Sequence, residues 1–143
     1  MGVAIGEGLE ATPIQLAASF AALANGGIYH APTLVRHADA GERVVREDTA
    51  RTVMAMLEGV TGDHGTGKAA RVDGVRVAGK TGTAELEADK SDGAYYASFV
   101  GAAPLDHPRY VVLVGAEAPR DRGTGGQVAA PVFSRVMKRA LAR

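Results

Sequence analysis

The stretch that decides the fold is GVRVAGKTGTAE, residues 74–85 of a chain of 143 residues. Its first eight letters fit the pattern G-x-x-x-x-G-K-[ST], which binds phosphates only when a glycine-rich turn joins a strand to a helix. Val75 and Val77 instead alternate with other residues, which is the two-residue period of a strand. No amphipathic helix pattern follows. The stretch therefore predicts that Lys80 lies on a β-strand and disfavours a nucleotide-binding loop.

On a strand, side chains alternate faces, so Lys80 and Gly82 share one face and Thr81 and Thr83 the other. Together these residues offer a cation, two hydroxyls and backbone N–H donors, and Gly82 leaves room for a molecule lying against the strand. That set suits a peptide or peptide mimic with a carboxylate. The other interpretation is a polar edge strand whose Lys and Thr residues discourage pairing with other sheets. The spacing alone leaves both interpretations open.

The composition excludes several classes of function. Sixteen basic residues balance sixteen acidic ones, which argues against a nucleic-acid partner or an anionic membrane surface. Because Cys is absent, disulfides and Cys nucleophiles are excluded. No run reaches the ~18 apolar residues of a membrane helix, so neither a membrane segment nor a targeting signal is expected in this chain. The histidines (His30, His37, His64 and His107) lack metal-ligand spacing, so no metal or other cofactor is expected.

The first helix has clear start and stop signals. Thr12–Gln15 form a capping box with Pro at the first helical position. Leu16, Phe20 and Leu23 then recur at helical spacing, with alanines between them that suggest close packing. Asn25–Gly27 tolerate positive φ and end the helix.

The remaining elements divide the chain into a helical segment, residues 1–73, and a segment of strands with a final helix, residues 74–143. Besides the strand around Lys80, they are a helix from about Asp48 to Glu58, strands Tyr95–Ala103 and Tyr110–Ala116, and a helix from about Ala129 to Leu141. The short connections predict an α+β fold, an antiparallel meander of about three strands with helices packed on one face. The third strand reads as buried.

Several short segments of the chain resemble a known family, and they occur in that family's order. They are Ile5–Gly8, Thr12–Ala17, Ala24–Tyr29, Met56–Val60, Gly65–Gly67, Val77–Ala84, Ala97–Gly101, Ala103-Pro104 and Gly126–Phe133. They are similar to the family's G-x-G-x-x-x-T-P-x-Q-L-A, A-N-G-G-x-Y, K-T-G and A-A-P-V-F motifs. Over nearly its whole length, the chain resembles the C-terminal part of the transpeptidase domain of class B penicillin-binding proteins.

This resemblance implies a reaction and a set of roles. In the family, the serine of an S-x-x-K motif attacks a D-Ala-D-Ala stem peptide of peptidoglycan, and an amine of a second stem peptide resolves the acyl-enzyme; β-lactams acylate the same serine. The resemblance implies that Lys80 supplies positive charge near the reacting hydroxyls and the carboxylate of the substrate. It implies that the hydroxyls of Thr81 and Thr83 bind that carboxylate. It makes the backbone N–H of Thr83 an oxyanion-hole donor, while Gly82 keeps the strand clear.

The serines depart from the family pattern. None of Ser19, Ser91, Ser98 and Ser134 begins an S-x-x-K motif, and an S-x-N motif is also missing. We expect Ser19 and Ser98 at core or strand positions, Ser91 in a turn and Ser134 on a helix surface. The chain alone is therefore expected to be inactive, with Met1 beginning a fragment of a truncated or divided protein.

A fragment is expected to expose apolar surface that other parts of the domain normally cover. We then expect it to associate with itself or with the missing N-terminal half, or to be unstable. Two other interpretations stay open: a catalytically inactive structural or interaction module, and a relative of serine β-lactamases or D,D-carboxypeptidases. The resemblance implies that the parent protein acts in the periplasm, at the outer face of the cytoplasmic membrane.

Overall fold

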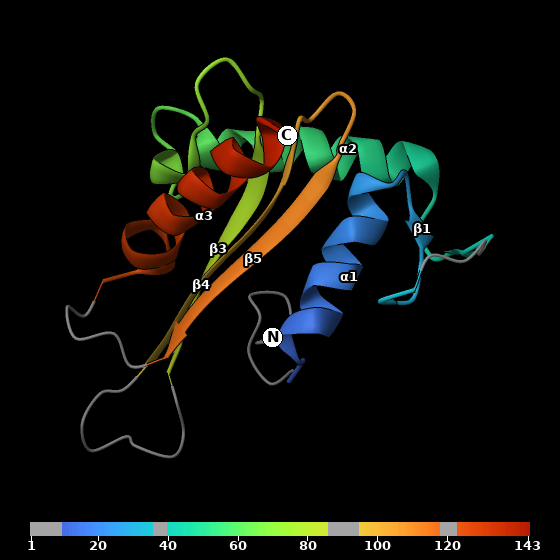
Figure 1. The fold of residues 1–143 in the computed structure, drawn as a ribbon, viewed down its shortest axis with the longest axis horizontal. Helices are drawn as coiled ribbons and strands as arrows, with labels where there is room; N and C mark the ends of the chain where they lie inside the picture. The colour runs from blue at the N-terminus through green and yellow to red at the C-terminus, as the bar shows by residue number, and fades with distance from the viewer. Residues whose placement is uncertain (1–9, 36–39, 86–94, 118–122) are drawn as a thin grey trace.

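The computed structural model describes residues 10–35, 40–85, 95–117 and 123–143 (Figure 1). The elements in chain order are helix α1 (Pro13–Ala24), strands β1 (Ile28–Tyr29) and β2 (Glu42–Arg43), helix α2 (Glu47–Glu58), short 3₁₀ helices η2 (Gly59–Thr61) and η3 (Lys68–Ala70), strands β3 (Ala78–Glu85), β4 (Tyr95–Ala103) and β5 (Tyr110–Glu117), and helix α3 (Gly125–Leu141). Ser91, which is expected in a turn, and His37 lie outside the described residues.

The central sheet is an antiparallel meander in the order β3-β4-β5, as predicted. The predicted bounds of β4 are confirmed, whereas the ladder of β3 begins only at Ala78. Val75 precedes it in an isolated bridge to Val72. β5 is half-buried along most of its length, so the prediction of a buried strand is wrong.

Helices cover both faces of this sheet, so the prediction of helices on one face is wrong. Figure 1 shows α3 on one side of the sheet and α1 on the other. The reason lies in β4, where Phe99 and Val100 point to opposite faces and both are buried. Phe99 packs in a cluster with Phe133 of α3, with ring centroids 4.8 Å apart, whereas Val100 packs in a second cluster with Phe20 of α1 and Met54 of α2.

Helix α1 begins and ends where the sequence indicates. The Thr12–Gln15 capping box is present, and Gly26 and Gly27 have φ values of 65° and 90° after the last turn. Phe20 is buried and Leu23 half-buried on its inner face, but Leu16 is 41% exposed. The described residues therefore cover the side chain of Leu16 only in part.

Helix α3 begins at Gly125, four residues before the predicted start. Thr124 and Gln127 form a capping box in which the Thr124 backbone N–H donates to Gln127 Oε1 at 2.9 Å. Proline is usually found in the first turn of a helix, so Pro131 suggests a later start than the observed one. Among the described residues, no helix has the length and apolarity needed to cross a bilayer.

Candidate functional site

The four residues expected to bind a ligand all lie in β3. In the part of the chain that the structure describes, β3 pairs only with β4, so its other edge is open. The carbonyl of Val77 accepts a hydrogen bond from Thr61 Oγ1 at 2.9 Å, and the carbonyl of Thr81 accepts one from Lys80 Nζ at 2.8 Å. Backbone groups alternate along an antiparallel strand, so the N–H of Thr83 also faces the open edge.

Lys80 and Gly82 lie on the α1 and α2 face of the sheet, because Lys80 pairs with Val100 and Gly82 with Ser98. Lys80 is exposed, and its ammonium folds onto the Thr81 carbonyl of the same strand. A Cβ at position 82 would lie 2.5 Å from Ser98 Oγ. The Ser98 hydroxyl therefore occupies the space beside Gly82, and a side chain at position 82 would require that hydroxyl to rotate away.

Thr81 and Thr83 lie on the α3 face, where both hydroxyls have partners. Thr81 Oγ1 lies 3.1 Å from Thr66 Oγ1, in the turn between η2 and η3. Thr83 Oγ1 accepts a hydrogen bond of 3.2 Å from the backbone N–H of Gly125, the first residue of α3. Reasoning from the sequence missed Thr66 and Gly125 as neighbours of the site, although the Gly65–Gly67 motif was part of the family resemblance.

Glycines bring the three segments of this site together. A Cβ on Gly125 would lie 2.2 Å from the Ser98 carbonyl oxygen, and one on Gly126 would lie 2.0 Å from the carbonyl oxygen of Thr66. The positive end of the α3 dipole consequently lies beside the Thr83 hydroxyl. Beside this contact is an open hollow of about 460 Å³, lined by Thr66, Lys68, Ala69, Thr124, Gly126 and Gln127.

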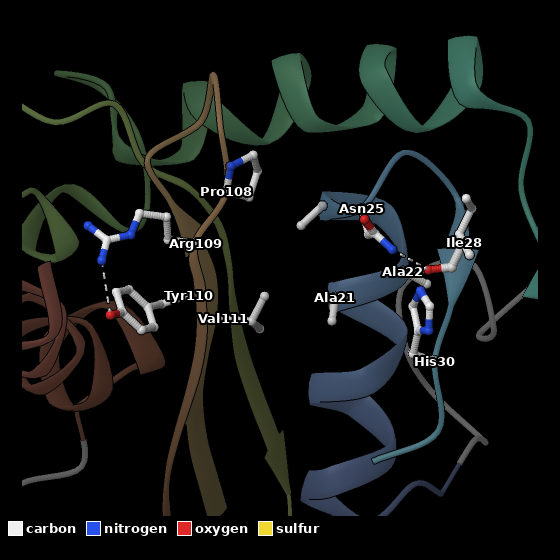
Figure 2. A pocket seen from close by; sticks show the side chains of 10 residues that line it. Ala21, Ala22, Asn25, Ile28, His30, Pro108, Arg109, Tyr110 and Val111 are labelled. Atoms are coloured by element: carbon white, nitrogen blue, oxygen red, sulfur yellow. Dashed lines mark hydrogen bonds between the residues drawn. The ribbon is translucent and has the colours of Figure 1, made fainter. Parts of the chain in front are cut away.

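A separate pocket of about 330 Å³ lies between α1 and the start of β5 (Figure 2). Asn25 and His30 lie on one side of it and Pro108 on the other. Arg109 donates to Tyr110 Oη at 3.3 Å, and both side chains point away from α1. Three alanines of α1 form part of the wall, and Asn25 Nδ2 donates to the Ile28 carbonyl at 3.3 Å.

Two of the serine predictions are wrong. Ser134 is buried and donates to the carbonyl of Arg71, so it fixes α3 to the segment before β3. Ser19 is exposed on α1 and donates to the carbonyl of Gln15. Ser98 lies on a strand as predicted.

Arg76 links two parts of the fold just before β3. Its guanidinium donates to both carboxylate oxygens of Glu58, at 2.6 and 2.7 Å, and to Asp106 at 2.5 Å. These hydrogen bonds hold the pKa of Glu58 below its usual value. Arg71 lowers the pKa of Asp63 in the same way. Among the described residues, no group of His, Asp and Glu side chains is arranged to hold a metal ion.

Comparison with known proteins gives consistent matches along the chain. The family described as "Penicillin binding protein transpeptidase domain" matches residues 1–138. Stage V sporulation protein D of Bacillus subtilis is 36% identical over 157 residues, covering 96% of this chain and 24% of that protein. Peptidoglycan D,D-transpeptidase FtsI of Escherichia coli is 39% identical over 140 residues, covering 92% of this chain and 23% of that protein. The chain thus spans about a quarter of the length of these relatives.

Solved structures agree in fold. The apo transpeptidase domain of Burkholderia pseudomallei penicillin-binding protein 3 is 40% identical with a TM-score of 0.88, covering 98% of this chain and 44% of that one. A peptidoglycan glycosyltransferase from Burkholderia ambifaria is 38% identical with a TM-score of 0.83, covering 98% of this chain and 43% of that one. The predicted α+β fold and the family resemblance are both confirmed.

Proposed function

Because the chain belongs to the family of penicillin-binding protein transpeptidase domains, we propose that it forms the K-T-G wall of a peptidoglycan D,D-transpeptidase site. The observation that carries the proposal is the open edge of β3, where Thr81 and Thr83 present hydroxyls and Lys80 a positive charge. On this proposal, residues 1–143 are one portion of a single transpeptidase domain. The parent protein cross-links stem peptides and acts in the periplasm.

The ligand is a D-Ala-D-Ala stem peptide or a β-lactam that lies along the open edge of β3 as an added strand. Thr81 and Thr83 donate hydrogen bonds to its carboxylate, and Lys80 supplies the opposite charge. The N–H of Thr83 donates to the oxygen that becomes negative when the carbonyl is attacked. These residues need no cofactor, and their part in the reaction is to bind, orient and stabilise charge.

The attacking serine comes from a segment outside this sequence, because none of its four serines begins an S-x-x-K motif. The partner of this chain is accordingly the N-terminal half of the transpeptidase domain. The missing nucleophile also favours a second candidate function, a module that binds the same ligand or a protein partner without catalysis.

The chain alone is expected to show no covalent labelling by a fluorescent penicillin. The physical reason is that a β-lactam bound at β3 finds no activated hydroxyl to acylate. Mass spectrometry of the purified chain after incubation checks this. A stoichiometric adduct would contradict the assignment of the nucleophile to another segment.

A segment exchange tests the proposed function. Residues 10–143 replace the matching part of the Burkholderia pseudomallei transpeptidase domain, with which the chain shares 40% identity. The exchanged domain is expected to be labelled by a fluorescent penicillin, and Lys80→Ala is expected to slow labelling by about tenfold or more, since a hydrogen bond to a charged group contributes ~1.5–3 kcal/mol.

Lys138→Ala is the matched control, because Lys138 is an exposed lysine of α3 that pairs with Asp73 and not with a residue of β3. It should leave the labelling rate unchanged. An exchanged domain that folds by circular dichroism but takes no label would contradict the proposal and favour the non-catalytic module.

A further inference from the structure

The two threonine hydroxyls of β3 are both held by neighbours, and the chemistry of those neighbours decides where the protons point. Gly125 offers a backbone N–H, which can only donate. Thr83 Oγ1 therefore accepts at 3.2 Å and keeps its own proton for another partner. The hydroxyl of Thr83 is thus oriented as a donor away from α3.

Thr81 differs because its neighbour is a second hydroxyl. Between Thr81 Oγ1 and Thr66 Oγ1, 3.1 Å apart, either atom can be the donor. When an anion approaches Thr81, the arrangement of lowest energy has Thr66 donating to Thr81 and Thr81 donating to the anion. Thr66 thus offers Thr81 the same kind of support that Gly125 gives Thr83.

The turn that carries Thr66 is packed so tightly that the residue has a fixed position. The N–H of Gly67 donates to the Val60 carbonyl at 2.9 Å. A Cβ at position 65 would lie 2.0 Å from that carbonyl oxygen, and a Cβ at position 67 would lie 2.6 Å from the Phe99 ring. On the other side, Gly126 lies against the Thr66 carbonyl.

We propose that Thr66 is a positioning residue that fixes the Thr81 hydroxyl as a hydrogen-bond donor to the carboxylate of a bound stem peptide or β-lactam, an inference that rests on the function proposed above. Thr66 acts through Thr81, whose hydroxyl lies 3.1 Å from its own. Holding Thr81 in one χ1 rotamer before the ligand arrives lowers the side-chain entropy that is lost when the ligand binds.

The first test needs no ligand. Three-bond couplings to the Thr81 methyl carbon, measured by NMR on the isotope-labelled full chain, report its χ1 angle. A single rotamer is expected in the wild type and in Thr66→Ser, and averaging in Thr66→Val, which keeps the shape and removes the hydroxyl. Averaged couplings in the wild type, or a fixed rotamer in Thr66→Val, would overturn the proposal.

The second test measures binding of an acetylated D-Ala-D-Ala peptide and of the same peptide with a C-terminal amide, each titrated into the full chain. Thr66→Val should weaken binding of the acid by about tenfold, the value of one net hydrogen bond, and leave binding of the amide unchanged. Thr66→Ser should restore the preference for the acid. Thr52→Val, which removes an exposed hydroxyl on α2, is the matched control and should alter neither affinity.

A double-mutant cycle shows whether Thr66 acts through Thr81. In a Thr81→Val background, Thr66→Val should have no further effect on the acid, because the hydroxyl that Thr66 orients is gone. Independent, additive effects would overturn the positioning role. A wild type that binds acid and amide equally would instead contradict the proposed function, while the χ1 measurement still decides the role of Thr66.

Discussion

At the scale of single residues, the approach of α3 to β3 depends on the absence of one side chain. A Cβ on Gly125 would lie 2.2 Å from the Ser98 carbonyl oxygen and 2.5 Å from that of Gly82. Gly125 does not have a positive φ, so space rather than backbone conformation requires glycine. The hydrogen bond from its N–H to Thr83 exists only because the helix can come this close.

Gly125→Ala is expected to lower the free energy of unfolding by about 1–3 kcal/mol, since a methyl group forced into a packed contact shifts the backbone. The same substitution should weaken binding of a carboxylate ligand at β3, because the Thr83 hydroxyl loses its partner. Urea unfolding and the peptide titration measure the two effects.

Gly59→Ala is the matched control for this prediction. Gly59 has φ −57° and ψ −24°, and a Cβ there would meet nothing within 4 Å. The substitution should raise the free energy of unfolding by about 0.4–1 kcal/mol, because alanine restricts the unfolded chain more than glycine. If Gly125→Ala and Gly59→Ala changed the free energy of unfolding equally, α3 would not lie in close contact with β3 and β4 at Gly125.

At the scale of secondary-structure elements, what the sequence could predict depends on whether the signal was local. The capping box at Thr12 and the run Tyr95–Ala103 are complete in themselves, and both were placed correctly. The start of β3 could not be predicted in this way, because the alternation of Val75 and Val77 begins before the pairing of β3 with β4. Ala78 pairs with Ala102 near the end of β4, so residues much before it have no strand to pair with.

The candidate site divides in the same way. A local pattern placed Lys80 and Thr81 on a strand. A local pattern could not identify Thr66 and Gly125 as neighbours of the site. Thr66 is 15 residues from Thr81 in the sequence, and Gly125 is 42 residues from Thr83. Their proximity depends on how α3 and the η2–η3 turn pack on the sheet, which no local pattern encodes.

The ion pair between α2 and the residue before β3 should make stability depend on pH. Glu58 has a lowered pKa in the folded chain because Arg76 hydrogen-bonds to it. Its contribution is therefore fully present above the unfolded value of about 4.3 and is lost as the pH falls through the lower folded value. Glu58→Gln should reduce the urea midpoint at pH 7, and the difference from the wild type should vanish in acid.

The control for this dependence is Glu42→Gln, which removes a carboxylate from an exposed residue of β2. Its urea midpoint should follow that of the wild type at every pH. A difference for Glu58→Gln that persists unchanged into acid would mean that shape, and not the charge of Glu58, stabilises this junction.

At the scale of the whole molecule, the sheet is covered on both faces, yet large apolar side chains remain exposed. Those of Ile14, Leu34, Val35, Val44, Met56 and Val136 have exposed fractions of 59%, 105%, 72%, 53%, 71% and 44%. Ile14 and Leu16, which is also exposed, both lie in the first turns of α1. The chain spans 44% of a related transpeptidase domain, so more than half of that domain lies outside the matched part.

The chain alone is therefore expected to associate with itself, because burying the first turns of α1 removes apolar surface from water. Sedimentation velocity should show a mass that rises with concentration. The double substitution Ile14→Gln and Leu16→Gln, which leaves the capping box of Thr12 and Gln15 intact, should shift the chain toward monomer. Ser19 on the same helix is exposed and already polar, so the Ser19→Gln variant should sediment like the wild type. A wild type that stays monomeric at all concentrations would show that these side chains are too scattered to form an interface.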